Sequence, residues 1–205
     1  MMINSPARQR CQHCTRPLAH CLCGLIPSLS SRTRILLLQH PDEAKHALNT
    51  ARLVALGLQN VQLLIGEKFD DLERYIQQPG YRACVLFPGE DAQELRAYQA
   101  AQQPLLLIVP DGTWRKARKI LYCNPLLTAL PRVTLAPGLS SRYRLRKAPD
   151  EHALATIEAV TYALSALEPN ADFSPLLRPF EALIEGQIRA MGVDVYQRNH
   201  VDSTH

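Results

Sequence analysis

The chain has 205 residues, of which 46% are hydrophobic and 20% are charged. This length allows one well-buried domain with a small appendage, and the composition is ordinary for a globular protein. No apolar run approaches the roughly 18–20 residues that span a bilayer, and the first ten residues lack the apolar core of a signal peptide. We therefore expect a cytoplasmic protein, whose thiols stay reduced.

The formal net charge is +4, but the charges are unevenly distributed. Residues 112–149 contain nine cations and no acid, which leaves 14 basic and 19 acidic residues elsewhere. Because opposite charges are usually interspersed on protein surfaces, this segment favours a face that binds a polyanion. The alternative is a solvated basic helix that acids from other parts of the chain balance in space.

Four of the six cysteines lie within thirteen residues, at Cys11, Cys14, Cys21 and Cys23. The first pair has the C-x2-C spacing that is usual for structural zinc, and the second pair, C-x-C, is tighter. A redox pair would sit in a βαβ context that is absent before Cys11, and a disulfide does not suit a reducing compartment. We predict a structural zinc knuckle within residues 1–30, since four thiolates leave no open position on the metal.

Apolar runs bounded by turn residues predict strands over 34–39, 61–65, 81–87, 104–109 and 132–135. Helical spacing predicts helices over 43–56 with Asp42 as N-cap, 70–77, 90–101, from Trp114 to about 121, 150–167, and 174–191 with Ser174 as N-cap. Alternating strands and helices predict an α/β fold, with a mostly parallel sheet covered by helices on both faces. We expect this domain to occupy residues 31–195 and to precede a disordered polar tail over 196–205.

Three predicted strands run directly into the polar or glycine-bearing turns QHP, FPGED and VPDGTW. The carboxyl ends of parallel strands meet at one edge of a sheet, where ligands bind in α/β proteins. Gly89 in the second turn allows a ligand to approach the backbone closely. The third turn combines Asp111, Thr113 and the only tryptophan, Trp114, with four cations that follow. We interpret it as an active-site loop that faces RNA.

Five motifs occur in a fixed order along the chain: CxxCxxPxxxCxC, HPDE with NTARL, FPGEDA, PDGTW and YRLRKAPDEHALATIEAV. Together they resemble the DTW-domain family, which is named for the D-x-T-W turn, and the resemblance covers Cys11 to about Leu167. It implies transfer of the 3-amino-3-carboxypropyl group of S-adenosylmethionine to N3 of a uridine in the variable loop of tRNA, with release of S-methyl-5'-thioadenosine. It also implies a SPOUT-like fold, in which the C-terminal half forms a trefoil knot.

The resemblance suggests which residues form the S-adenosylmethionine site. Asp111 is the candidate catalytic base for the N3 proton, with capping of the next helix or holding the donor's amino group as alternatives. Thr113 either bonds a ligand or caps that helix, and Trp114 either stacks on a base or lies in the core. The residues assigned to the donor are Pro88, Gly89, Asp111, Thr113, Trp114, Leu135, Tyr143, Arg146, Thr156 and Glu158.

The basic segment supplies the predicted RNA contacts. In RYRLRKAP, Arg142, Arg144 and Arg146 alternate, so on an extended chain they point the same way, toward RNA phosphates or with one of them on the donor's carboxylate. Thr156 and Glu158 either support the donor pocket or are ordinary polar residues of their helix. His40 and Asn49 are expected to brace the first turn. The residues assigned to RNA are Arg115, Lys116, Arg118, Lys119, Arg142, Arg144 and Lys147.

Two other functions remain compatible with these patterns. One is an S-adenosylmethionine-dependent RNA methyltransferase on the same scaffold, and the other is a non-catalytic, zinc-bearing RNA-binding module. The products formed from tRNA and S-adenosylmethionine distinguish the three. No feature of the sequence indicates an oligomeric state.

Overall fold

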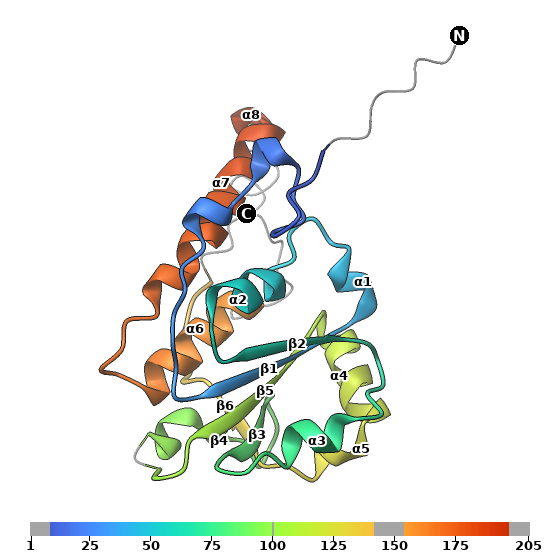
Figure 1. Ribbon diagram of the computed structural model, residues 1–205, viewed down its shortest axis with the longest axis vertical. Coiled ribbons are helices and arrows are strands. Elements are labelled where there is room, and N and C mark those ends of the chain that lie inside the picture. The colour runs from blue at the N-terminus through green and yellow to red at the C-terminus, as the bar shows by residue number, and fades with distance from the viewer. Residues whose placement is uncertain (1–8, 100, 142–153, 197–205) are drawn as a thin grey trace.

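The computed structural model describes residues 9–99, 101–141 and 154–196 (Figure 1). Its centre is one six-stranded sheet with the strand order β2-β1-β5-β3-β6-β4, and every neighbouring pair is parallel. The strands are β1 (Arg34–Gln39), β2 (Val61–Ile65), β3 (Arg82–Leu86), β4 (Gln93–Glu94), β5 (Leu105–Asp111) and β6 (Arg132–Thr134). The predicted α/β class with a parallel sheet is confirmed.

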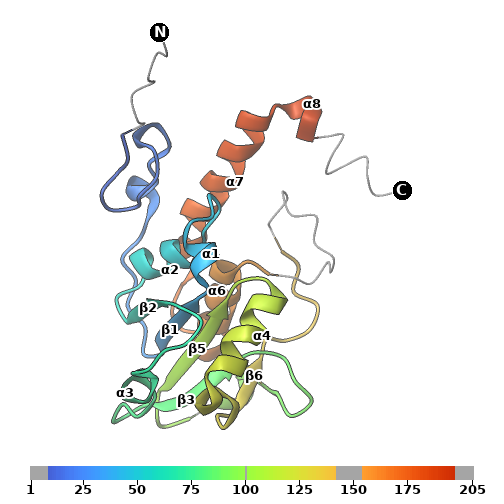
Figure 2. The ribbon, with the colours of Figure 1, turned by 90° about the vertical axis from the view of Figure 1, so that its right-hand side faces the viewer.

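Helices cover the sheet on both faces (Figures 1 and 2). The α-helices are α1 (Pro41–Ala44), α2 (Ala51–Gly57), α3 (Leu72–Ile76), α4 (Trp114–Cys123), α5 (Pro125–Thr128), α6 (Thr156–Leu167), α7 (Arg178–Met191) and α8 (Val193–Tyr196). Four 3-10 helices are η1 (Leu18–His20), η2 (Cys23–Leu25), η3 (Leu95–Tyr98) and η4 (Ser174–Leu177). α2, α6 and α7 pack on one face, and α3, α4 and α5 pack on the other.

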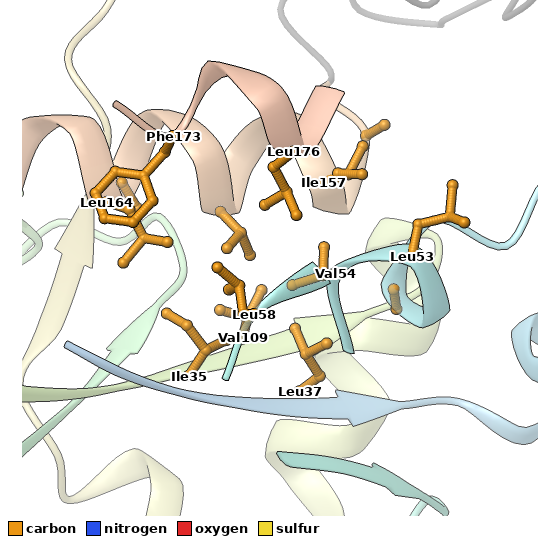
Figure 3. Packing of buried hydrophobic residues seen from close by; sticks show 14 of the residues in the cluster. Ile35, Leu37, Leu53, Val54, Leu58, Val109, Ile157, Leu164, Phe173 and Leu176 are labelled. Atoms are coloured by element: carbon orange, nitrogen blue, oxygen red, sulfur yellow. The ribbon is translucent and has the colours of Figure 1, made fainter. Parts of the chain in front are cut away.

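The inner strand β1, which lies between β2 and β5, contributes to two separate hydrophobic cores. Ile35 and Leu37 point toward α2, α6 and η4, where Figure 3 shows them below Val54 and Leu176. Leu36 and Leu38, whose side chains point to the opposite face of the sheet, pack against α3, α4 and α5 instead. A strand buried on both faces needs apolar side chains in both directions, which explains the unbroken run ILLL in the sequence.

The helix predicted over 43–56 is wrong, because the chain forms two short helices, α1 and α2, with a turn between them. The side chain of Asn49 accepts a hydrogen bond from the backbone N–H of Arg52 at 3.1 Å, which starts α2 afresh. Such local side-chain bonds compete with helix continuation. Asp42 is not the N-cap of α1, since His40 holds that position and accepts from the N–H of Asp42.

Two other predicted helices also differ from the structure. The segment predicted as a helix over 90–101 contains the short edge strand β4, where Gln93 pairs with Val133 of β6, and then η3. Pairing at the sheet edge outweighs the local helical pattern there. Ser174 is not an N-cap, because it begins η4 and its N–H donates to Asp172 Oδ1 at 2.9 Å, so the α-helix starts only at Arg178.

Several predictions about organisation are not tested by these elements. The division into residues 1–30, 31–195 and 196–205 stays a prediction, as do the SPOUT relation and the knot. Tyr196 ends α8, whereas 197–205 lie outside the described residues. None of the helices in the described part of the chain is long and apolar enough to cross a membrane.

Candidate active site

A cavity of about 510 Å³ opens at the carboxyl edge of the sheet. Its walls come from the turns after β3 and β5, from residues 134–139 after β6, and from the start of α6. The volume lies within the range of small-molecule sites, and most of the lining is apolar, as in such sites. Four residues assigned to the donor line it, namely Pro88, Trp114, Leu135 and Thr156.

Asp111 lies directly behind this wall, as the last residue of β5 and only 7% exposed. It stands opposite Gln39 of β1, whose Nε2 donates to Asp111 Oδ2 at 2.7 Å. The hydroxyl of Thr156 donates to the other carboxylate oxygen, so Thr156 connects the cavity wall to the carboxylate. Burial raises the pKa of Asp111, and the charge of Glu43 adds to this rise, while the two hydrogen bonds oppose it.

The hydrogen bonds around Asp111 continue away from the cavity. Gln39 and Asn49 exchange two side-chain bonds of 3.0 and 3.3 Å, so Asn49 braces the end of β1 as expected. Arg52, whose N–H bonds Asn49, also donates from Nη2 to the carbonyl of His13 at 2.9 Å. This network, buried at Asp111 and exposed at its far end, therefore reaches the cysteine-bearing segment.

The turn between β5 and α4 requires glycine at position 112. Gly112 has a φ of +153°, and a Cβ there would lie 2.9 Å from the Cβ of Lys116 and 3.6 Å from that of His40. Thr113 is the N-cap of α4, and its Oγ1 accepts from the N–H of Lys116 at 3.4 Å. Thr113 is not among the cavity-lining residues, so capping is its observed role.

Trp114 is not a core residue, because its side chain is 43% exposed. Its ring meets that of Phe87 edge to face, with centroids 5.7 Å apart and planes at 74°. The two rings line the cavity and also a second, shallower hollow beside it. Trp114 is thus available to stack on a ligand while Phe87 fixes its orientation.

Glu158 holds the entrance of α6 rather than lining the cavity. It is fully buried, and its Oε2 accepts from the N–H of Ala155 at 2.8 Å and from the Ser141 hydroxyl at 2.7 Å. The helix begins at Thr156, later than the predicted residue 150, and 150–153 lie outside the described residues. Glu158 therefore positions Thr156 by capping the helix on which it stands.

Gly89 leaves room for a side chain of this protein and not for a ligand in the cavity. A Cβ at Gly89 would lie 2.9 Å from Nη1 of Arg132, so the guanidinium occupies that space. Gly89 lines the shallow hollow instead of the cavity. Two further residues assigned to the donor, Tyr143 and Arg146, lie outside the described residues.

The cations of α4 fall into two groups. Lys116 Nζ lies 2.8 Å from Glu43 Oε1, and Lys119 Nζ lies 2.7 Å from Glu67 Oε2, where it lowers the pKa of that carboxyl. No carboxylate in the described ranges pairs with Arg115 or Arg118. The other residues assigned to RNA, Arg142, Arg144 and Lys147, lie outside those ranges.

Comparison with known proteins matches residues 8–188 to the DTW domain. The chain belongs to the DTW-domain family. A Macaca fascicularis protein named tRNA-uridine aminocarboxypropyltransferase 2 is 33% identical over 198 residues, which are 90% of this chain and 66% of that protein. The Drosophila melanogaster protein of the same name is 32% identical over 194 residues, 88% of this chain and 76% of that protein.

A plant relative is similarly distant. The Arabidopsis thaliana tRNA-uridine aminocarboxypropyltransferase A is 30% identical over 199 residues, 80% of this chain and 75% of that protein. The chain thus spans about two thirds to three quarters of the length of these relatives. The family resemblance predicted from the motifs is confirmed, and the DTW turn itself forms part of the cavity wall.

The DTW match begins at residue 8 and so includes the cysteine-bearing segment. The Sγ atoms of Cys11, Cys14, Cys21 and Cys23 all lie within 4.8 Å of one another. Cys11 and Cys23 are separated by 3.5 Å, and Cys14 and Cys21 by 3.7 Å. Four sulfurs at about 2.3 Å from a tetrahedral zinc ion would be about 3.8 Å apart, so the cluster is compatible with zinc.

The close packing of these thiols supports a role as metal ligands, because it helps to shift their pKa values in opposite directions. Backbone N–H groups, first that of Cys14, lower the pKa of Cys11 to about 6. Burial, together with the neighbouring thiols, raises the pKa of Cys23 to about 12. Four sulfurs this close cannot all ionise at neutral pH unless a cation compensates their charge. The donor set fits a closed, structural metal site.

Part of the site is not foreseen from the sequence. Gln39 is the main example, because it reads as the polar end of an apolar strand, yet it is 1% exposed and bonds Asp111. Leu139 lies outside the five motifs, and Leu154 is an ordinary apolar position within the last of them, yet both line the cavity. A polar residue closing an otherwise apolar central strand is the one available signal, since a buried amide needs a partner.

Proposed function

We propose that this protein transfers the 3-amino-3-carboxypropyl group of S-adenosylmethionine to N3 of a uridine in tRNA. The observation that carries the proposal is the position of the family's defining turn: Trp114 lines the cavity, and Asp111 lies behind Thr156 in its wall. The relatives named above are aminocarboxypropyltransferases acting on tRNA uridine.

The cavity suits the donor by size and lining. S-adenosylmethionine supplies carbons that its sulfonium activates, and the protein must present only one of them to the acceptor. Apolar walls that include Leu135 and Pro88 suit the adenosine and thioether portions, and Trp114 offers a ring for stacking. Orientation of this kind contributes up to roughly 7–11 kcal/mol to lowering a barrier.

Asp111 is the proposed base for the acceptor. In the overall reaction a bond forms between N3 and the donor carbon, the carbon–sulfur bond breaks, and sulfur keeps the electron pair in S-methyl-5'-thioadenosine. The N3 proton passes to Asp111, whose raised pKa brings it closer to the range of an effective base. Gln39 and Thr156 hold the carboxylate in place. The alternative role is to hold the donor's amino group.

The remaining parts of the proposal concern the metal and the RNA. The four-cysteine cluster would hold a structural Zn²⁺, and its thiolates suit the reducing cytoplasm. Arg115 and Arg118 of α4 would meet the RNA backbone, together with Arg142, Arg144 and Lys147.

One assay separates the proposed function from its alternatives. The protein is incubated with unmodified tRNA and S-adenosylmethionine, and the small products and the digested nucleosides are analysed by mass spectrometry. RNA-dependent S-methyl-5'-thioadenosine with an aminocarboxypropyl-uridine is the expected result. S-adenosylhomocysteine would indicate a methyltransferase, and neither product a binding module. A reaction without RNA is the control, because S-adenosylmethionine slowly releases methylthioadenosine by itself.

A further inference from the structure

A second hollow, of about 790 Å³, lies beside the cavity and shares one wall with it. The shared residues are Phe87, Pro88 and Trp114, whereas the rest of the lining comes from the turn after β3 and from α4, α5 and β6. The residues that belong to this hollow alone are Gly89, Arg118, Leu121, Tyr122, Thr128 and Arg132. We call it the side hollow.

One face of α4 forms the floor of the side hollow. Trp114, Arg118, Leu121 and Tyr122 recur at helical spacing and therefore share that face. Tyr122 is 86% exposed, so its ring is not used by the core. An aromatic ring this accessible, in the same hollow as the exposed ring of Trp114, provides a flat surface on which another ring can stack.

The charges at the side hollow have no acidic partner in the described part of the chain. Neither Arg118 nor Arg132 forms an ion pair there, whereas Lys116 and Lys119, on the other side of the same helix, are each paired with glutamate. The guanidinium of Arg132 lies against Gly89, where any side chain would displace it. Within the described residues, the hollow thus contains two guanidinium groups without a carboxylate partner and an exposed aromatic ring.

This combination matches the chemistry of a nucleotide. Single-stranded nucleic acids are held by aromatic rings that stack on the bases and by arginines that bind the phosphates. A peptide partner would not need paired guanidinium groups unless it were acidic, and it would gain nothing from a hollow that adjoins the donor cavity. The observations therefore favour RNA.

We propose that the side hollow binds the nucleotide next to the target uridine in the RNA acceptor. Its base stacks on Tyr122, and its phosphate lies between Arg118 and Arg132. The target uridine itself must reach the donor cavity, and the edge-to-face contact of Phe87 with Trp114 separates the two spaces. A neighbouring nucleotide fits the far side of this partition. The identity of the acceptor rests on the proposed function.

The test measures binding of tRNA by fluorescence anisotropy without the donor, so that it does not depend on catalysis. Tyr122→Ala removes the stacking ring and should weaken binding about 10- to 100-fold, whereas Tyr122→Phe keeps the ring and should bind within about twofold of the wild type. Arg118→Ala should weaken binding as well. Arg189→Ala, which removes an exposed cation of α7 on the opposite layer, is the matched control for charge.

Two further measurements decide between outcomes. The affinity for S-adenosylmethionine should be unchanged in Tyr122→Ala, and so should the melting temperature, because the side chain is exposed. If Tyr122→Ala binds tRNA as the wild type does, the side hollow is not an RNA subsite, even if the transfer reaction proceeds. If RNA binding depends on Tyr122 but no methylthioadenosine forms, the side hollow stands and the proposed function fails.

Discussion

The buried network around Asp111 and the exposed face of α4 adjoin the same cavity, but they differ in whether their polar groups have partners within the protein. Asp111, Gln39 and Asn49 come from three segments, and each is bonded to the next. On α4, Arg118 has no carboxylate partner within the described residues. Buried groups that are hydrogen-bonded to one another are held in a fixed position, as catalysis requires. Exposed cations without a carboxylate partner can instead bind an anionic group from solution.

The largest expected effect comes from breaking the buried side of this comparison. Asp111→Asn keeps the size of the side chain but removes the proposed base, so turnover should fall by about 10²–10⁴-fold while the donor still binds. Methylthioadenosine release measures turnover, and calorimetry measures donor binding. Asp42→Asn is the matched control, because that carboxylate is exposed on α1, and it should react almost normally.

The same variant tests the electrostatic cost of burying Asp111. Because its pKa is raised in the folded protein, its contribution to stability is present below the unfolded pKa and is lost as the pH rises through the folded pKa. Asp111→Asn should therefore be no less stable than the wild type at neutral pH.

Normal turnover of Asp111→Asn would remove Asp111 from the mechanism, and lost donor binding would favour its role in holding the amino group.

Removing the proposed zinc ion tests how far the network around Asp111 depends on the cysteine cluster. Cys14→Ser should lower the bound zinc well below one ion per chain under reducing conditions and lower the melting temperature, since structural metal sites stabilise their fold. Donor affinity should weaken a few-fold through the bond from Arg52 to His13. Cys123→Ser, outside the cluster, should keep its zinc, and a metal-free wild-type protein would contradict the assignment.

A smaller effect is expected from Thr156→Val, which removes one of the two hydrogen bonds that oppose the raised pKa of Asp111. If ionised Asp111 is the base, wild-type kcat/KM should fall as the pH drops through this raised pKa. In Thr156→Val that fall should begin at a higher pH. Thr161→Val is the control, because the Thr161 hydroxyl donates to the Ile157 carbonyl within α6 rather than to Asp111, and an unshifted profile in both variants would oppose the base role.

The smallest effect sharpens the exposed side. Arg118→Ala should reduce the log–log salt slope of RNA binding by about 0.7, the contribution of one phosphate contact on a single strand. Lys119→Ala should leave the slope almost unchanged, because Glu67 already compensates that charge. The slope is obtained from anisotropy titrations at several salt concentrations. Equal slopes for the two variants would show that pairing within the protein does not decide which cations meet RNA.

The sequence predicts the sheet better than the helices, for physical reasons. β1 and β2 have the expected bounds, because an apolar run that ends at a strand-breaking proline or glycine leaves little choice of where the strand ends. The break between α1 and α2 depends on Asn49, whose side chain could either continue a helix or cap the next one. Nothing local distinguishes the two, since Gln39, its other partner, comes from the preceding strand.

The candidate site shows the same division. The turn with Asp111 and Trp114 stands out by composition alone. The partners of Lys116 and Lys119 do not, because Glu43 and Glu67 are far away in the sequence and only the fold brings them to α4. The charge pattern could therefore predict a basic segment but not which of its cations remain uncompensated.

The pairing of β1 with β5 has a consequence for folding. Gln39 and Asp111 are 72 residues apart, yet they meet at the last register position of these two neighbouring strands. A slip of one residue would turn the Gln39 side chain to the other face of the sheet and leave the carboxylate without it. Contacts this distant in sequence form late and slowly. Recovery of donor binding during refolding would thus report correct strand register. The far-UV circular dichroism signal of the helices does not detect it.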